Sequence, residues 1–141
     1  MSAAGDLLLV EDNPSDAELM LESLARLDLQ DRVHVVRDGD EALAWLFGGG
    51  RPRVVLLDVK LPKVGGFDVL RAMRSDPRTR HTPVVMFTSS NIERDVALAY
   101  DLGANGYVQK PVDFTRFREV VEAVGRYWMS INLTPRDDAQ G

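Results

Sequence analysis

Five short apolar runs, each followed by a segment whose apolar residues recur at helical spacing, constrain the fold of this chain most strongly. The runs comprise residues 7–10, 33–36, 54–57, 83–87 and 106–109. The third run, Val54-Val55-Leu56-Leu57, has no polar alternation, which is typical of a parallel strand buried on both faces. Strict alternation of strands and helices predicts an α/β domain, a doubly wound five-stranded parallel sheet with helices on both faces.

Residues that favour helix starts follow several of these runs. Asn13 predicts a helix cap, and Pro14 fits the first helical position, where a missing N–H loses no partner. Ser90 and Glu93 have the spacing of a capping box, which predicts that a helix opens there. The last helix is long and amphipathic, with apolar positions from residue 114 to residue 128.

Composition narrows the class of protein. A chain of 141 residues fits one domain, and 45% hydrophobic with 28% charged residues is the balance of a soluble globular protein. No apolar run approaches the roughly 20 residues of a membrane span, and the net charge of −5 argues against a nucleic acid partner. The lack of cysteine excludes disulfides, thiolate catalysis and Cys-ligated zinc, and it fits a cytoplasmic protein.

Polar residues that can carry chemistry follow four of the five strands. Glu11 and Asp12 come after the first, Asp58 after the third, Thr88 after the fourth and Lys110 after the fifth. Each alone has an ordinary explanation, since acids cap helices, threonines start loops and lysines cover surfaces. The carboxyl ends of parallel strands meet at the same edge of a sheet, however, so the five residues together predict one shared site.

Three carboxylates at one edge need a cation, because two unit charges about 4 Å apart repel by about 4 kcal/mol at an effective dielectric of ~20. Oxygen ligands without His or Cys favour a hard ion, and Mg²⁺ suits carboxylates completed by water and phosphate oxygens. Lys110 would add positive charge and Thr88 a hydroxyl donor, a combination that neutralises a phosphoryl group in transit. Asp58 is the predicted nucleophile, since a carboxylate can accept a phosphoryl group as an acyl phosphate.

These residues resemble the receiver domains of two-component response regulators. The resemblance extends from Leu7 to Trp128, and its motifs are Glu11-Asp12, Leu56-Leu57-Asp58 with Leu61-Pro62 and Gly66, Thr88-Ser89, and Lys110-Pro111. It implies a flavodoxin-like receiver fold over residues 1–129, strand order 2-1-3-4-5, and a cis peptide bond between Lys110 and Pro111. It also implies a signalling domain rather than an enzyme, in which Asp58 accepts a phosphoryl group from a phosphohistidine of a sensor histidine kinase.

The resemblance implies a ligand set for Mg²⁺. Asp12 and Asp58 would bind the ion directly together with the backbone carbonyl of Lys60, and Glu11 would bind it through water. Lys60 also occupies a position that in receivers tunes the loss of the phosphoryl group to water, and its side chain either hinders or helps that step. Many receivers have Asp-Gly where this chain has Gly65-Gly66, a loop change that we expect to be tolerated.

The resemblance also implies a switch. Thr88 and Lys110 would hold the phosphoryl oxygens, and Tyr107 lies where receivers place an aromatic residue that turns inward when the hydroxyl residue moves toward the phosphoryl group. The alternative is an ordinary tyrosine of an edge strand. In the switch role, phosphorylation changes the face formed by the fourth helix, the fifth strand and the fifth helix.

The end of the chain raises the question of output. Residues 130–141 are expected to form an arm or tail with no output domain, so that output is a protein contact or phosphoryl shuttling. Trp128 either folds back on its own core or belongs to an exposed apolar patch with Tyr127 and Ile131. The second reading predicts a homodimer through the last helix, with the arm against the second subunit.

A finer resemblance concerns the kinase partner. Three stretches look like those of stand-alone regulators that are paired with bacterial phytochrome kinases, namely residues 11–16, 110–114 and 127–128. The implied partner is therefore a sensor histidine kinase of the bacteriophytochrome type.

Three other functions compete with this interpretation. A phosphohydrolase of the haloacid-dehalogenase type needs a second Asp two residues after its nucleophile, where this chain has Lys60. A flavodoxin shares the strand order, but Glu11-Asp12 would repel the phosphate of its flavin. A degenerate receiver, acting as a phosphorylation-independent binding module, usually lacks the acceptor, an acid or the lysine, and this chain has all of them.

Overall fold

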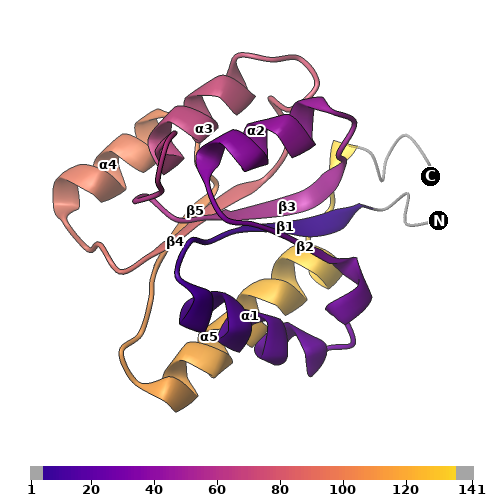
Figure 1. The fold of residues 1–141 in the computed structure, drawn as a ribbon, viewed down its shortest axis with the longest axis vertical. Helices are drawn as coiled ribbons and strands as arrows, with labels where there is room; N and C mark the ends of the chain where they lie inside the picture. The colour runs from indigo at the N-terminus through magenta and orange to yellow at the C-terminus, as the bar shows by residue number, and fades with distance from the viewer. Residues whose placement is uncertain (1–4, 136–141) are drawn as a thin grey trace.

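Five parallel strands form a central sheet in the order β2-β1-β3-β4-β5, with helices on both faces (Figure 1). The computed structural model describes residues 5–135. The strands are β1 (Asp6–Val10), β2 (Val33–Val36), β3 (Pro52–Leu57), β4 (Val84–Thr88) and β5 (Gly106–Gln109). The helices are α1 (Pro14–Ala25), α2 (Gly39–Phe47), α3 (Gly66–Arg74), α4 (Glu93–Asp101) and α5 (Phe114–Arg126), with short helical turns η2 (Gln30–Arg32) and η3 (Tyr127–Ile131). The predicted fold class and strand order are confirmed.

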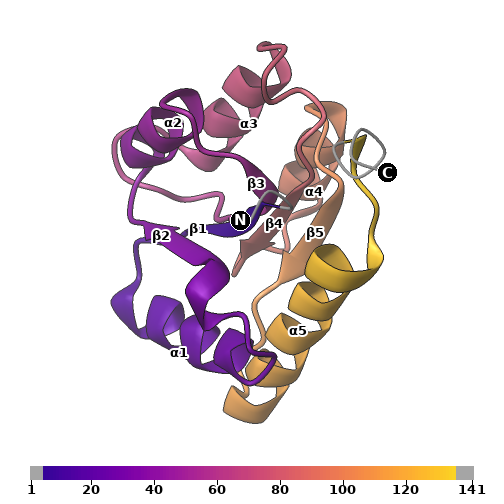
Figure 2. The same ribbon diagram turned by 90° about the vertical axis from the view of Figure 1, so that its right-hand side faces the viewer.

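Each face of the sheet has its own hydrophobic core. Because side chains alternate along a strand, Leu8 and Val10 of β1 join the core under α2, α3 and α4, whereas Leu7 and Leu9 join the core under α1 and α5 (Figures 1 and 2). Coverage of both faces explains why these strands are apolar at consecutive positions. Within residues 5–135, no helix combines the length and hydropathy needed to cross a bilayer.

The register of the sheet aligns the carboxyl ends of its strands. Val10 of β1 lies opposite Leu57 of β3, Leu57 lies opposite Met86 of β4, and Thr88 of β4 lies opposite Gln109 of β5. The residues that follow these strands therefore emerge along a single edge of the sheet.

Two glycines hold the loop after β3 close to this edge. A Cβ atom on Gly66, at the start of α3, would overlap the carbonyl oxygen of Asp58, and a Cβ atom on Gly39, at the start of α2, would overlap the carbonyl oxygen of Val64. The N–H of Gly66 also donates to the carbonyl oxygen of Val59 at 3.0 Å. The loop is therefore packed between the end of β3 and the first turn of α2, with no room for a side chain at either glycine.

Two local predictions are wrong. The bond between Lys110 and Pro111 is trans, as are the other peptide bonds within residues 5–135. Trans is the more stable form of an X–Pro bond by about 0.5–1 kcal/mol, so the cis form needs surroundings that select it. The capping box is also absent, because the Ser90 hydroxyl donates to Asp95 Oδ2 at 2.7 Å and helix α4 begins at Glu93 without a side-chain cap.

The chain after α5 continues beyond the end of the helix and runs beside its own domain, as the yellow segment in Figure 2 shows. Trp128 packs against the core under α1 and α5, which favours the predicted reading in which it folds back. The carbonyl oxygen of Asn132 accepts a hydrogen bond from Arg53 Nη2 at 2.7 Å, and Thr134 is buried. Tyr127 and Ile131 remain exposed. Of the predicted arm, residues 136–141 lie outside the described residues.

Candidate functional site

Acidic residues meet at the edge of the sheet where β1 and β3 end. Glu11 and Asp12 follow β1, Asp58 follows β3, and one carboxylate oxygen from each lies within 4.8 Å of the others. Glu11 is 1% exposed and Asp58 is 7% exposed, whereas Asp12 is open to solvent. The structure therefore brings together the three acids that the sequence predicted at this edge.

Lys110 extends into the acidic cluster from the end of β5. Its backbone N–H donates to the carbonyl oxygen of Thr88 at 2.7 Å, which ties the start of the β5–α5 loop to the end of β4. Its Nζ lies 2.7 Å from Glu11 Oε1, 2.9 Å from Asp16 Oδ2 and 2.9 Å from Asp58 Oδ2, and only 9% of the side chain is exposed. One ammonium group is thus shared by three carboxylates.

The pKa values reflect this sharing. Burial, with a smaller contribution from the charge of Asp58, raises the pKa of Glu11 to about 7, although Lys110 and the N–H of Asn13 act in the opposite direction. Burial alone would lower the pKa of Lys110, but its hydrogen bonds to Glu11, Asp16 and Asp58 outweigh burial and hold that pKa above its usual range. The ammonium therefore stays charged, while the site still has more negative charge than it can neutralise.

The group of carboxylates fits a divalent hard cation. Its three members offer oxygen ligands only, and two of them are buried, where an ionised carboxylate needs a compensating positive charge. Mg²⁺ is commonly held by a few carboxylates completed by water. The loop after β3 adds a polar contact, because the N–H of Lys60 donates to Asp58 Oδ1 at 3.3 Å.

Thr88 and Tyr107 are linked through Ser90 in the β4–α4 loop. Thr88 is buried, and its Oγ1 accepts a hydrogen bond from the N–H of Ser90 at 3.3 Å. The hydroxyl of Tyr107 donates to the carbonyl oxygen of Ser90 at 2.9 Å, and its ring packs against the core under α2, α3 and α4. Tyr107 in the edge strand β5 is therefore half-buried and hydrogen-bonded to the β4–α4 loop.

Sequence reasoning gave no role to two residues that the structure places in these networks. Asp16 contacts Lys110, and Asp95 accepts the hydrogen bond from the Ser90 hydroxyl. A signal for Asp16 was available, because the cap at Asn13 puts it in the first helical turn after the acidic pair. No comparable local signal marks Asp95, since the capping-box spacing indicates Glu93 instead.

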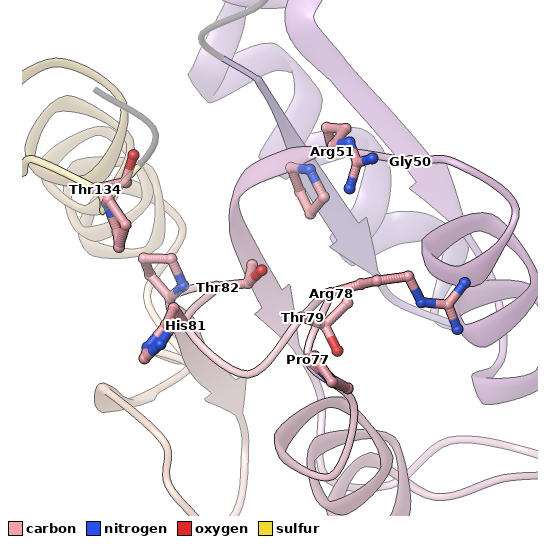
Figure 3. Close-up of a pocket in the computed structure, with 11 residues that line it drawn as sticks. Gly50, Arg51, Pro77, Arg78, Thr79, His81, Thr82 and Thr134 are labelled. Atoms are coloured by element: carbon pink, nitrogen blue, oxygen red, sulfur yellow. The ribbon is translucent and has the colours of Figure 1, made fainter. Parts of the chain in front are cut away.

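A cavity lies elsewhere, at the opposite edge of the sheet (Figure 3). It has a volume of about 340 Å³ and is lined by residues near the amino ends of β3 and β4 and by residues 134 and 135, among them Pro52, Thr79, Pro83 and Thr134. None of the carboxylates at the other edge lines it. This cavity is therefore separate from the carboxylate cluster.

Comparison with known proteins agrees with the geometry at the carboxyl edge. A sequence model described as the response regulator receiver domain matches residues 7–122. The chain belongs to this family. Among curated relatives, the receiver is 41% identical to a probable methanogenesis regulatory protein, FilR2, from Methanothrix harundinacea, over 92% of this chain and 86% of that protein. It is 33% identical to the response regulator Rcp1 from Synechocystis, over 92% of each.

Solved structures of similar proteins share the receiver fold. The phosphorylated cyanobacterial phytochrome response regulator RcpA matches with a TM-score of 0.87 and 36% identity, over 93% of this chain and 98% of that one. The Mn²⁺-bound form of Rcp1 gives a TM-score of 0.84 at 31% identity, over 93% and 99%. The bacteriophytochrome response regulator AtBRR is 45% identical, with a TM-score of 0.70 over 92% and 98%.

Proposed function

We propose that this receiver takes a phosphoryl group from a sensor histidine kinase onto Asp58, in a Mg²⁺-dependent reaction, and thereby switches a protein-interaction surface. The placement of the Asp58 carboxylate carries the proposal. The side chain is 9% exposed, its Oδ2 lies 2.9 Å from Lys110 Nζ, and one of its oxygens lies within 4.8 Å of carboxylate oxygens of Glu11 and Asp12. A buried carboxylate beside an ammonium and further metal-binding carboxylates suits an acceptor of phosphoryl groups.

In the transfer, an oxygen of ionised Asp58 attacks the phosphorus of the kinase phosphohistidine. A P–O bond forms while the P–N bond breaks, and the electron pair returns to the imidazole nitrogen, which takes up a proton. Negative charge is spread over the three phosphoryl oxygens in this step. Lys110 neutralises part of it through an N–H, Thr88 supplies a hydroxyl donor, and the Lys60 N–H on Asp58 Oδ1 helps to orient the carboxylate.

Mg²⁺ supplies the remaining positive charge when it is bound. We assign Asp12, Asp58 and the backbone carbonyl of Lys60 as direct ligands, with Glu11 acting through a water molecule. The cluster of three carboxylates and the burial that raises the pKa of Glu11 support this assignment. The Mn²⁺-bound structure of the relative Rcp1 supports a divalent cation in a protein of this kind.

The switch in this proposal consists of Thr88 and Tyr107. When the phosphoryl group draws the Thr88 hydroxyl, the bond from the Ser90 N–H to Thr88 Oγ1 is lost, and the loop that carries the Ser90 carbonyl must adjust. Tyr107 donates to that carbonyl, so its position responds to the same event. The surface formed by α4, β5 and α5 is then the one that changes between the two states.

A bacteriophytochrome is the kinase that we propose as partner, in the cytoplasm. RcpA is a phytochrome response regulator and AtBRR is a bacteriophytochrome response regulator. The name of FilR2 associates a relative of similar identity with methanogenesis. The test measures phosphoryl transfer to this receiver from a purified bacteriophytochrome and from a histidine kinase of another sensory class. We expect transfer within seconds from the bacteriophytochrome and slower transfer from the other kinase.

We also propose that residues 1–129 act as a single receiver and that the last helix and the arm from residue 130 form a homodimer. The exposed apolar side chains at this end support a contact, and these are Tyr127, Ile131 and Leu133. Trp128 packs on its own core and contributes less to such a surface. Sedimentation at tens of micromolar, with and without a phosphoryl mimic, measures the association, and a monomer under both conditions contradicts the dimer.

Labelling with acetyl phosphate and Mg²⁺, read by intact-mass spectrometry, tests the acceptor. The wild type and the variant Asp101→Asn, which alters an exposed aspartate at the end of α4, should gain one phosphoryl group. The variant Asp58→Asn should gain none, because an amide oxygen is a poor nucleophile. Undiminished labelling of Asp58→Asn rejects Asp58 as the acceptor. A wild type that is never labelled favours the alternative function, a degenerate receiver that binds its partner without phosphorylation.

A further inference from the structure

One carboxylate at the site has no part in the reaction proposed above. Asp16 lies in the first turn of α1, and its Oδ2 accepts a hydrogen bond from Lys110 Nζ at 2.9 Å. The helix start fixes its position, because the Asp16 N–H donates to the capping oxygen Oδ1 of Asn13 at 3.1 Å and Pro14 occupies the first turn. Asp16 is therefore presented to Lys110 by a capped and conformationally restricted segment.

The contact uses the last donor of Lys110. A lysine ammonium group has three N–H donors, and Glu11, Asp16 and Asp58 provide one acceptor each at 2.7, 2.9 and 2.9 Å. With 9% of the side chain exposed, solvent has little access to this nitrogen. A phosphoryl oxygen can therefore bind Lys110 only if one of the three carboxylates gives up its hydrogen bond.

The exposure of the three carboxylates indicates which one gives way. The side chain of Glu11 is 1% exposed and that of Asp58 is 9% exposed, whereas that of Asp16 is 29% exposed. If Glu11 lost its ammonium partner, its buried carboxylate would be left with an uncompensated charge, which is strongly unfavourable, and Asp58 is no longer a free carboxylate once it carries the phosphoryl group. Water can replace the ammonium at Asp16 with a smaller loss, so Asp16 is the partner most easily released.

We propose that Asp16 is a positioning residue that holds Lys110 in the unphosphorylated protein and competes with the phosphoryl group for it. This inference rests on the proposed function of the site. The negative charge of Asp16 favours the unphosphorylated state, because it attracts the ammonium that the phosphoryl oxygens require. Asp16 thereby limits how firmly the site retains a phosphoryl group.

Binding of beryllofluoride, a tetrahedral mimic of the phosphoryl group, at saturating Mg²⁺ tests the competition. Asp16→Asn removes the charge and should bind beryllofluoride about three- to tenfold more tightly than the wild type, the size expected for weakening a charged hydrogen bond. Asp16→Glu keeps the charge and should stay close to the wild type. Glu18→Gln is the matched control, since it removes one charge from an exposed position on the same helix, and it should change the affinity less than about twofold.

The outcomes separate the alternatives. An effect of Asp16→Asn no larger than that of Glu18→Gln would mean that only net charge matters, and it would overturn the proposal. Weaker binding by Asp16→Asn would overturn it as well, because Asp16 would then prepare Lys110 for the phosphoryl group instead of competing for it. A wild type that binds no beryllofluoride would contradict the proposed function of the whole site.

A second measurement tests the contact without any phosphoryl mimic. The chain has only three lysines, and Lys60 and Lys63 are exposed, so a slowly exchanging ammonium signal in ¹⁵N-resolved spectra belongs to Lys110. In the metal-free protein, Asp16→Asn should accelerate exchange of this signal with water severalfold, and Glu18→Gln should leave it unchanged. An unchanged Lys110 signal in Asp16→Asn would show that Asp16 does not hold the ammonium and would reject the inference, whatever the beryllofluoride result.

Discussion

At the scale of single residues, Glu11 gives the site its electrostatic character. It is 1% exposed, and burial together with the neighbouring Asp58 raises its pKa to about 7. Lys110 compensates only in part, because it is shared with Asp16 and Asp58. Ionised Glu11 is therefore unfavourable in the folded, metal-free protein, and a bound cation relieves that penalty.

This leads to a prediction about pH. The pKa of folded Glu11 lies above its unfolded value of 4.5, so the folded state binds more protons between pH 4.5 and pH 7, and the metal-free protein gains stability as the pH falls through this window. At about pH 8, Glu11→Gln should be more stable than the wild type by on the order of 3 kcal/mol, at about 1.4 kcal/mol for each pKa unit. At about pH 4.5 the two proteins should differ little.

Urea unfolding in EDTA at the two pH values measures the difference. Glu18→Gln is the control, because it removes the same charge from an exposed position of α1. A difference between Glu11→Gln and the wild type that stays constant with pH contradicts the raised pKa.

At the scale of elements, the β4–α4 loop depends on one buried serine. Ser90 is 9% exposed, and three of its polar groups contact different elements: its N–H contacts Thr88 of β4, its hydroxyl contacts Asp95 of α4, and its carbonyl contacts Tyr107 of β5. The first turn of α4 is thus fixed relative to the end of β4 by a side-chain bond. A displacement of Thr88 reaches α4 and β5 through the same residue.

A double-mutant cycle tests this link. Ser90→Ala and Asp95→Ala should each lower the free energy of unfolding by about 1–3 kcal/mol, and the double variant should lose less than their sum by about 0.5–2 kcal/mol. Both single variants should also alter the signal of fluorine-labelled Tyr107. Glu93→Ala, in the same helical turn, is the control and should leave Tyr107 unchanged. Additive losses in the cycle contradict a direct bond between Ser90 and Asp95.

At the scale of the whole molecule, the site draws on most of the chain. Its side chains come from residues 11 to 110, and they meet because four strands end at the same edge of the sheet. An unfolded chain cannot present these groups together. Binding of a cation at the site therefore favours the folded state of the entire domain.

We expect Mg²⁺ at about 100 times its dissociation constant to raise the free energy of unfolding of the wild type by about 2.7 kcal/mol. Asp12→Asn removes a proposed ligand from an exposed position and should lose most of this gain at the same Mg²⁺ concentration. Asp101→Asn, which also changes an exposed aspartate, should keep it. Unfolding curves with and without EDTA measure the gain, and equal gains in both variants contradict Asp12 as a ligand.

Local chemistry explains why so much was predictable from the sequence. Consecutive apolar residues such as those of β3 are tolerated only in a strand that is covered on both faces, so they indicate a parallel sheet. Because parallel strands all end at the same edge, the chemically active residues at the ends of four strands could be assigned to one site from the sequence alone. Glu11, Asp58 and Lys110 meet there for this reason.

The sequence did not predict which side chains bond to one another, nor backbone conformations such as the isomer of an X–Pro bond. Both depend on packing between distant segments, so only the tertiary structure showed them. The Ser90 hydroxyl bonds to Asp95 and does not cap the helix at Glu93. The Lys110–Pro111 bond is trans, and Trp128 packs on the core of its own domain. The contact between Asp16 and Lys110 joins residues 94 positions apart. No local pattern encodes such a pair, since it exists only when α1 and the end of β5 are packed against the same strands. The sequence alone determined which chemical groups gather at the edge, and the tertiary structure decided which of them share the one ammonium group.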